Sequence, residues 1–226
     1  MAQPEDRPAK ANLVQRSASA MVLATVALAA VYWGTPVFDW LIAVGALILA
    51  WEWNRLCAGR LAWLAGGLLY IAVPCWALLY LRADPVAGTE TLFWLLAVVW
   101  AADTGAYAFG RWIGGPKMSP VISPKKTWSG LIGGVGSAGV VGAVTAIILE
   151  KHGFLGLSGW SAVIGGVSQA GDLAESWVKR HFGVKDTSGI IPGHGGLFDR
   201  VDGLLAAAVA VAAITLAGNG SFLTWM

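Results

Sequence analysis

The chain has 226 residues, of which 57% are hydrophobic and only 12% are charged. An average soluble domain carries about 25% charged residues, so this composition argues against a soluble fold and favours the membrane class. The 13 tryptophans and 30 glycines fit that class, because tryptophan gathers at bilayer interfaces and glycine lets membrane helices approach closely. The net charge of +2 gives no support to nucleic-acid binding. Cys57 and Cys75 lie far apart and show no metal spacing, so we interpret both as packing residues.

Seven stretches qualify as membrane helices, each of which needs about 20 mostly apolar residues. The first follows three bases, as the core of a cleaved signal peptide would. A second apolar stretch comes immediately afterwards, so we expect an uncleaved first helix. The sixth contains two acids and is weak by hydropathy. The predicted spans are Ser17–Trp33, Val37–Arg55, Leu61–Leu81, Thr91–Phe109, Gly130–Leu149, Leu157–Val178 and Gly203–Leu223.

The distribution of the 15 lysines and arginines supports seven spans. With a cytoplasmic N-terminus, all of these bases lie inside except Arg82 and Lys151, as the positive-inside rule requires. The sequence therefore predicts an all-α, polytopic integral membrane protein with about seven transmembrane helices. Residues 1–12 would form a polar cytoplasmic tail, and residues 13–226 a single integral-membrane domain.

Two cytoplasmic loops, within residues 110–130 and 176–202, hold many of the bases. Both loops are rich in glycine, proline and serine, so neither is expected to form a long regular helix. Both would lie at the cytoplasmic surface, beside a polar cavity between the helices.

The acids of the sixth span share one helical face with two other polar residues. Asp172, Glu175, Ser176 and Lys179 stand at i, i+3, i+4 and i+7. Ionised groups within a membrane helix are costly and usually functional. The alternative is an internal ion pair, such as Glu175 with Lys179, that only locks helices together. For Glu175 both readings stay open, whereas Asp172 lies deeper with no cation one turn away, which favours function.

Two more acids, Asp199 and Asp202, precede the last predicted span. Acids at a helix start can cap the helix and are favoured by its dipole, and this reading suits Asp202 well. The functional reading makes Asp199 a ligand for a hard divalent cation held between it and Asp172. Mg²⁺ typically uses one or two carboxylates together with substrate phosphates.

Two further acids lie in other spans. Asp103 in the fourth span is either a functional group or a polar contact between helices. Glu52 lies near a predicted interface, where we expect it to pair with Arg55, and we assign it no role in the site.

The lysines and arginines of the two loops lie close to these acids in the predicted topology. Bases beside metal-binding carboxylates suggest phosphate chemistry, because cations neutralise the charge of a transferring phosphoryl group. Alternatively, these bases only set topology and attract anionic lipids. The glycine-rich run at 192–196 could let backbone N–H groups approach an anion, or it could be a plain turn containing His194. The bases concerned are Lys125, Lys126, Lys179, Arg180, Lys185 and Arg200.

Residues 176–202, the signature stretch, resemble the signature of phosphatidate cytidylyltransferases, also called CDP-diacylglycerol synthases. Three upstream segments, "DTGAYAFGR", "SPKKTWSG" and "GDLAESWVKR", also look like this family. The likeness is strong from about residue 103 to 203. The matching signature positions are Ser176, Lys179, Arg180, Lys185, Asp186, Pro192, His194, Gly195, Gly196, Asp199, Arg200 and Asp202.

The resemblance implies an enzyme that converts CTP and phosphatidic acid into CDP-diacylglycerol and pyrophosphate for phospholipid synthesis. It implies Mg²⁺, with K⁺ as a candidate companion ion, held by Asp172 and Asp199. The expected catalytic residues are Asp172, Asp199, Lys185 and Asp186. The expected substrate-binding residues are Ser123, Lys125, Lys126, Ser176, Lys179, Arg180, His194, Gly195, Gly196, Arg200 and Asp103.

In this interpretation the helices of residues 17–100 precede a signature-bearing catalytic part at about 101–226. CTP, phosphatidic acid and membrane lipids are the expected partners, nucleic acid is not, and a homodimer is compatible with the sequence. The expected location is the bacterial cytoplasmic membrane, with the active site on the cytoplasmic side.

The sequence leaves two alternative functions open. A CTP-dependent lipid kinase would transfer the terminal phosphate of CTP instead. An ion-coupled transporter would also carry intramembrane acids, but it would more often place them near the midplane and show repeat symmetry. No repeat is visible here, and the charges cluster at the cytoplasmic end.

Overall fold

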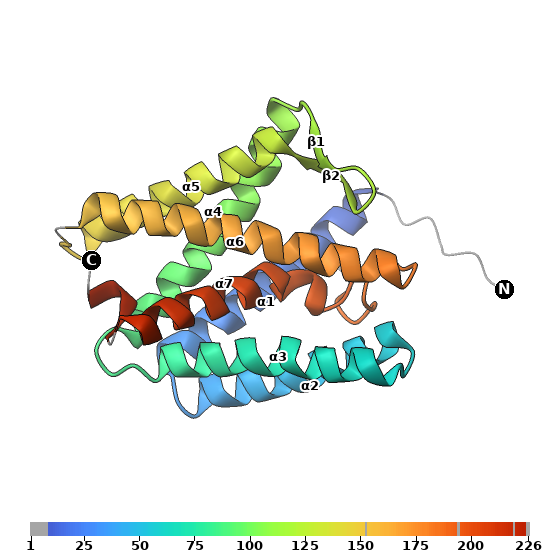
Figure 1. Ribbon diagram of the computed structural model, residues 1–226, viewed down its shortest axis with the longest axis horizontal. Coiled ribbons are helices and arrows are strands. Elements are labelled where there is room, and N and C mark those ends of the chain that lie inside the picture. Colours follow the sequence, from blue (N-terminus) through green and yellow to red (C-terminus); the bar gives the residue numbers. More distant parts are fainter. Residues whose placement is uncertain (1–8, 152, 194, 219, 225–226) are drawn as a thin grey trace.

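The computed structural model describes residues 9–151, 153–193, 195–218 and 220–224, and it confirms the all-α class (Figure 1). A two-stranded sheet and a short 3₁₀ helix, η1 (Phe222–Thr224), complete the described secondary structure. The long helices are α1 (Ala9–Trp33), α2 (Val37–Cys57), α3 (Leu61–Arg82), α4 (Gly88–Trp112), α5 (Trp128–Ile148), α6 (Phe154–His181) and α7 (Phe198–Ala217).

Five of these helices, α2, α3, α4, α5 and α7, are long and apolar enough to cross a membrane, which confirms the polytopic membrane class. The apolar part of α1 is shorter, at Ser17–Trp33, and α6 carries a row of polar side chains. Each predicted span overlaps one long helix, and successive long helices alternate in direction (Figure 1). That α1 and α6 also cross the bilayer stays a prediction. Residues 9–12 belong to α1, whereas residues 1–8 of the predicted tail lie outside the described residues.

The last predicted span was placed too late in the chain. Helix α7 begins at Phe198 and ends at Ala217, whereas hydropathy predicted residues 203–223. The polar first turn of α7 hides the true start from a hydropathy window, because two of its first five residues are aspartates.

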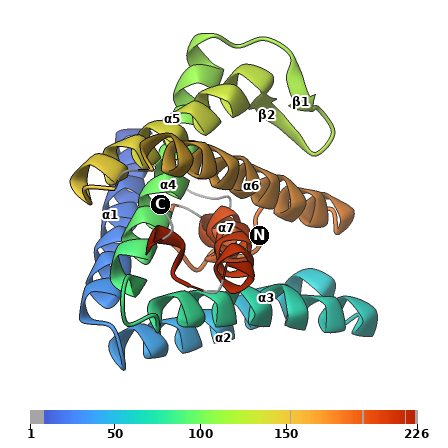
Figure 2. The ribbon, with the colours of Figure 1, turned by 60° about the vertical axis from the view of Figure 1, so that its left-hand side comes forward.

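Helix α7 lies at the centre of the bundle, with α2 and α3 on one side and α5 and α6 on the other (Figure 2). It packs against α3, α4 and α6. Glycines bring α4, α5 and α6 into close contact. A Cβ at Gly134 would lie 2.6 Å from the Ala102 carbonyl oxygen of α4, and one at Gly142 would lie 2.5 Å from the Leu157 carbonyl oxygen of α6. Such approach is how small residues stabilise membrane helix pairs.

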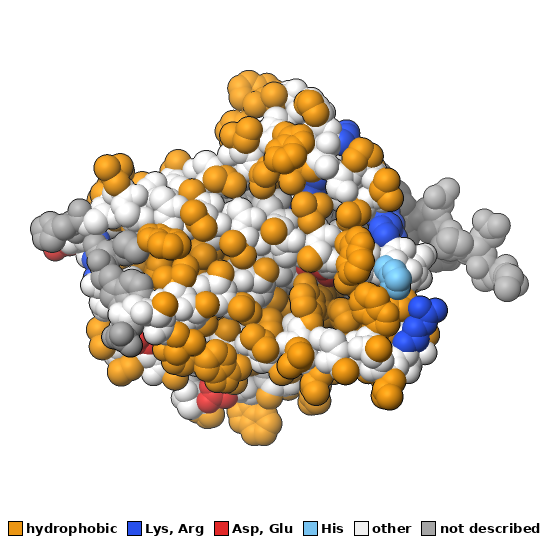
Figure 3. Space-filling model, viewed as in Figure 1, with side chains coloured by type: hydrophobic (Ala, Val, Ile, Leu, Met, Phe, Trp, Pro, Cys, Tyr) orange, Lys and Arg blue, Asp and Glu red, His pale blue; other side chains and the backbone are white. Residues whose placement is uncertain are grey.

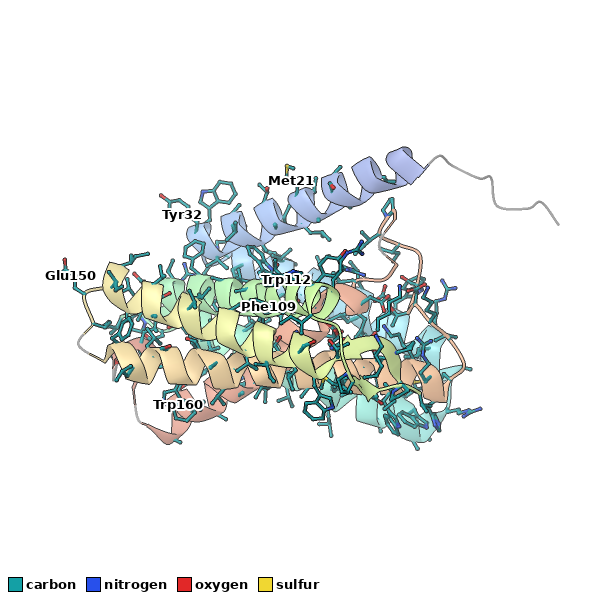
Figure 4. All side chains as sticks on the ribbon, turned by 90° about the horizontal axis from the view of Figure 1, so that it is seen from above. Met21, Tyr32, Phe109, Trp112, Glu150 and Trp160 are labelled. Carbon is teal, nitrogen blue, oxygen red and sulfur yellow. The ribbon has the colours of Figure 1, made fainter. Side chains whose placement is uncertain are left out.

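Apolar side chains are spread over the whole face seen in Figure 3, and most of the lysines and arginines visible there lie toward one end. Met21 and Tyr32 of α1 are 68% and 73% exposed, and Figure 4 shows both pointing away from the bundle. In a bilayer such side chains would contact lipid, so the exposed apolar surface agrees with the membrane class.

Both predicted polar loops lie at one end of the bundle, here called the polar end (Figure 1). As expected, neither forms a long helix. The first contains an antiparallel pair, β1 (Lys117–Ser119) and β2 (Ser123–Thr127), and Thr127 then caps α5 by accepting the Gly130 N–H at 3.1 Å. The second, residues 182–197, is irregular and holds one isolated bridge between Ile191 and Gly195.

Candidate active site

Lys126 of β2 joins polar side chains of α4 and α6. Its ammonium nitrogen lies 2.8 Å from Asp172 Oδ2 and also donates to the backbone and side-chain oxygens of Gln169, at 3.3 and 3.4 Å. The Gln169 amide donates to Asp103 Oδ1 at 2.8 Å, and the Ser176 hydroxyl donates to Asp172 Oδ1 at 3.3 Å. The hairpin and the two helices therefore bring four predicted site residues into one network.

A second lysine, Lys179 of α6, is held between two acids. Its nitrogen lies 2.5 Å from Glu175 Oε2 and 2.6 Å from Asp199 Oδ1 of α7. The three side chains are only 11%, 3% and 4% exposed, respectively. The structure thus contains the predicted ion pair between Glu175 and Lys179. Lys179 also pairs with Asp199, and this second contact joins α6 to the start of α7.

Asp199 is the most heavily hydrogen-bonded acid of the signature stretch. Oδ1 accepts from Lys179, and Oδ2 accepts from the Gly196 N–H at 2.9 Å, the Thr187 N–H at 3.1 Å and the Thr187 hydroxyl at 3.1 Å. Oδ1 is therefore held by α6 and Oδ2 by the second loop. The Gly196 N–H, which was expected to bind a substrate phosphate, donates its hydrogen bond to Asp199 in the structure.

Asp202 does not cap the last helix, contrary to the expectation. Helix α7 starts at Phe198, so Asp202 lies beyond its first turn, and Oδ1 accepts the N–H of the adjacent Gly203 at 2.7 Å. Asp202 and Asp103 each interact electrostatically with Asp172. Three carboxylates from α4, α6 and α7 therefore share one region of the polar end.

These carboxylate oxygens are suitable ligands for a hard cation, because Mg²⁺ binds carboxylate oxygens. Asp172 is 34% exposed, Lys126 pairs with it, and two further acids, Asp103 and Asp202, act on it. Within the described residues, however, no three His, Cys, Asp or Glu side chains are grouped so as to hold a metal ion, and Asp172 and Asp199 pair with different lysines, Lys126 and Lys179. A metal bridging Asp172 and Asp199 stays a prediction.

The other expected site residues lie around the same polar end. Ser123 of β2 is half-buried and Lys125 is exposed, while Lys185 and Asp186 are exposed in the second loop. Arg180 is also exposed and joins the loops, donating to the Ile122 carbonyl at 3.3 Å and the Val184 carbonyl at 2.9 Å. Gly195 takes a positive φ of 84° and lies beside Asp186, and His194 lies outside the described residues.

A cavity of about 640 Å³ opens between α1, α2, α3, α4 and α7. Its lining is mainly aliphatic, and three of its members are polar: Asp103, Thr104 and Arg200. Asp103 also belongs to the Lys126 network. The cavity therefore connects an apolar interior with the charged residues of the polar end.

Comparison with known proteins places this geometry in a family. The model of the Cytidylyltransferase family matches residues 59–217. The chain belongs to the cytidylyltransferase family. A protein of Brucella suis biovar 1 named phosphatidate cytidylyltransferase is 47% identical over 168 residues, which is 74% of this chain and 61% of that protein. One of Rickettsia bellii with the same name is 35% identical over 206 residues, covering 88% of this chain and 89% of its own.

Three residues of the cytidylyltransferase polar end were missed by sequence reasoning. Gln169 links Lys126 to Asp103, the Thr187 hydroxyl donates to Asp199 of α7, and the Ser188 hydroxyl donates to Glu52 of α2. Gln169 is a polar residue within a predicted membrane span, and this feature could have marked it as a candidate site residue. Thr187 and Ser188 follow Lys185-Asp186 but resemble ordinary loop residues.

The expected pair of Glu52 with Arg55 is wrong. The Arg55 guanidinium instead lies over the Trp51 ring, 4.8 Å from its centroid. Glu52 is fully buried and points to the signature stretch. It lies outside the region matched by the family model, which begins at residue 59.

Proposed function

We propose that this chain transfers the cytidylyl group of CTP to phosphatidic acid, giving CDP-diacylglycerol and pyrophosphate. The observation that carries the proposal is the charged polar end, with its lysine–carboxylate networks, beside an apolar cavity in a member of the cytidylyltransferase family. A reaction between a water-soluble nucleotide and a lipid phosphate needs a polar and an apolar compartment side by side.

In the proposed reaction an oxygen of the lipid phosphate attacks the α-phosphorus of CTP. A new P–O bond forms, the bond between the α-phosphorus and the bridging oxygen breaks, and that oxygen leaves with the bonding electrons as part of pyrophosphate. Both reactants are anions at neutral pH, so the attack needs charge neutralisation and positioning more than a strong base.

The bases of the polar end would supply that neutralisation. Lys125 and Lys185 are exposed and can reach nucleotide phosphates, while Lys126 is held in place by Asp172 and Gln169. Arg200 lines the cavity and would face the lipid phosphate. Mg²⁺, held by Asp172 and Asp199, would supply charge neutralisation for the pyrophosphate leaving group.

The acyl chains of phosphatidic acid would lie in or against the aliphatic cavity, with the phosphate toward Arg200. We place the polar end at the cytoplasmic surface of a bacterial inner membrane, because almost all bases lie on that side in the seven-span topology. CTP then reaches the site from the cytosol.

Filling the cavity should impair use of the lipid more than use of the nucleotide. Gly45 of α2 lines the cavity, and a Cβ built there meets no atom within 4 Å. Gly45→Phe should therefore lower kcat/KM for phosphatidic acid about 10-fold and leave the KM for CTP nearly unchanged. Kinetics in mixed micelles, with each substrate varied in turn, measure both effects.

Gly66→Phe is the matched control, because Gly66 of α3 is exposed, has the same empty surroundings and lies outside the cavity lining. It should behave like the unchanged protein. Equal lipid kinetics for the two variants would exclude the cavity as the acyl-chain site.

Pyrophosphate release by the purified protein in detergent tests the proposed reaction as a whole. Release should require CTP, phosphatidic acid and Mg²⁺ together, and omission of the lipid should reduce it to background. Pyrophosphate release that ignores the lipid would refute the proposal.

A further inference from the structure

Glu52 is the least expected charge in the molecule. It lies in α2, near the C-terminal end of that helix, and its side chain is fully buried. Burial of a carboxylate carries a large desolvation cost unless the group is paired or hydrogen-bonded. Among the described residues, no lysine or arginine forms an ion pair with it. Its stabilisation must come from hydrogen-bond donors.

Those donors all belong to the signature stretch. Glu52 Oε1 accepts the Leu197 N–H at 2.9 Å and Oε2 accepts the Phe198 N–H at 2.8 Å. The Ser188 hydroxyl donates to Oε1 at 2.5 Å, and the Thr187 hydroxyl lies 3.4 Å from Oε2. The carboxylate thus binds two consecutive N–H groups at the start of α7, where the helix dipole favours an anion.

Helix α7 has no cap of its own. Its N-cap position is Leu197, whose side chain cannot accept a hydrogen bond. Glu52 therefore caps α7 from another helix, about 145 residues away in sequence. Gly196 allows this close approach, because a Cβ there would lie 2.5 Å from Glu52 Oε1 and 2.0 Å from the Thr187 hydroxyl oxygen.

The contacts of Glu52 and Asp199 interlock. Gly196 donates its N–H to Asp199, and the next two residues donate theirs to Glu52. The Thr187 hydroxyl lies within hydrogen-bond distance of both carboxylates. Any shift of the loop that breaks one set of contacts must disturb the other, so the place of Asp199 depends on Glu52.

We infer that Glu52 is a positioning residue for the proposed transfer, fixing the second loop and the start of α7 so that Asp199 and its partner Lys179 hold their places. This inference rests on the proposed function for its kinetic consequence, but its structural consequence can be measured without substrate. Glu52 is fully buried, so in this account it acts through Thr187, Ser188 and the start of α7, which in turn hold Asp199.

Glu52→Gln provides the test. The amide keeps one acceptor and replaces Oε2 with a donor that faces the Phe198 N–H, so this N–H at the start of α7 loses its acceptor. We expect kcat per folded molecule to fall about 10- to 100-fold, as for residues that orient a site from behind, with KM for CTP changed less than about 3-fold. Hydrogen exchange in residues 187–198 should accelerate about 10-fold or more without substrate, while exchange in α4 and α5 stays unchanged.

Two further variants keep the test decisive. Asp39→Asn makes the same chemical change on the other acid of α2, and it should match the unchanged protein in kcat and in exchange. Ser188→Ala removes one donor to Glu52 and leaves its charge, so it should lower kcat about 3- to 10-fold even if Glu52→Gln does not fold.

Unchanged kcat in Glu52→Gln, or unchanged kcat in Ser188→Ala where Glu52→Gln does not fold, would overturn the inference. So would exchange that accelerates equally throughout the bundle. If the unchanged protein itself makes no CDP-diacylglycerol, the proposed function fails. The exchange comparison between Glu52→Gln and Asp39→Asn then still decides whether Glu52 holds the loop.

Discussion

Replacing either predicted metal ligand should nearly abolish turnover. In Asp172→Asn and Asp199→Asn the shape of the side chain is kept, but its charge is lost, so a cation and the phosphates it neutralises lose their anchor. We expect kcat to fall about 1,000-fold or more in each variant, with expression and membrane insertion intact. Initial rates of CDP-diacylglycerol formation, normalised to folded protein, measure the effect.

Asp84→Asn serves as the control for these two changes. Asp84 lies in the turn between α3 and α4, at the opposite end of the bundle, where it accepts the N–H groups of Val86 and Ala87. An asparagine can still accept there, so activity should be retained. Substantial activity in Asp172→Asn or Asp199→Asn would remove that residue from the metal site.

Loss of the Lys179 charge should give the largest effect on stability. Lys179→Met leaves Glu175 and Asp199 buried together without their shared cation. Breaking a buried ion pair by removing one partner costs about 3–5 kcal/mol. For a chain of this size that corresponds to a midpoint of thermal unfolding in detergent lowered by about 6 to 20 °C.

The exposed Lys117 of β1 provides the comparison, since Lys117→Met removes a lysine without uncovering buried acids. Its unfolding midpoint should stay within about 2 °C of the unchanged protein. A similar small shift for Lys179→Met would mean that the α6–α7 ion pairs contribute little to the fold.

The positions of the long helices along the chain could largely be predicted from the sequence. Long apolar stretches showed the membrane helices, and the unequal distribution of bases put both polar loops on the same side. The structure places those loops at one end of the bundle. These features follow from local composition, because a bilayer requires apolar spans of a fixed length.

The partners of the charged residues could not be predicted in the same way. Local spacing suggested Glu175 with Lys179, which is present, but it also suggested Glu52 with Arg55, which is not. Glu52 instead meets residues 187–198, because α2 and the start of α7 meet at the polar end. Such contacts depend on which helices pack together, and hydropathy does not encode that choice.

The start of α7 illustrates the same limit. A hydropathy window favoured Gly203, since the polar residues before it resemble a loop. The helix begins at Phe198 because a carboxylate from another helix satisfies its first N–H groups. A cap supplied across the fold leaves no local sequence pattern such as a serine or aspartate at the N-cap.

The position of the phosphorus that reaches the lipid tests the central proposal most directly. Purified protein would receive phosphatidic acid, Mg²⁺ and CTP labelled at either the α- or the γ-phosphate. The account predicts that α-label enters a chloroform-soluble lipid in amounts equal to the pyrophosphate released, and that γ-label stays in the aqueous phase. Lipid labelled from the γ-phosphate would indicate a lipid kinase instead, and absence of lipid label from both forms of CTP would contradict the cytidylyl transfer proposed here.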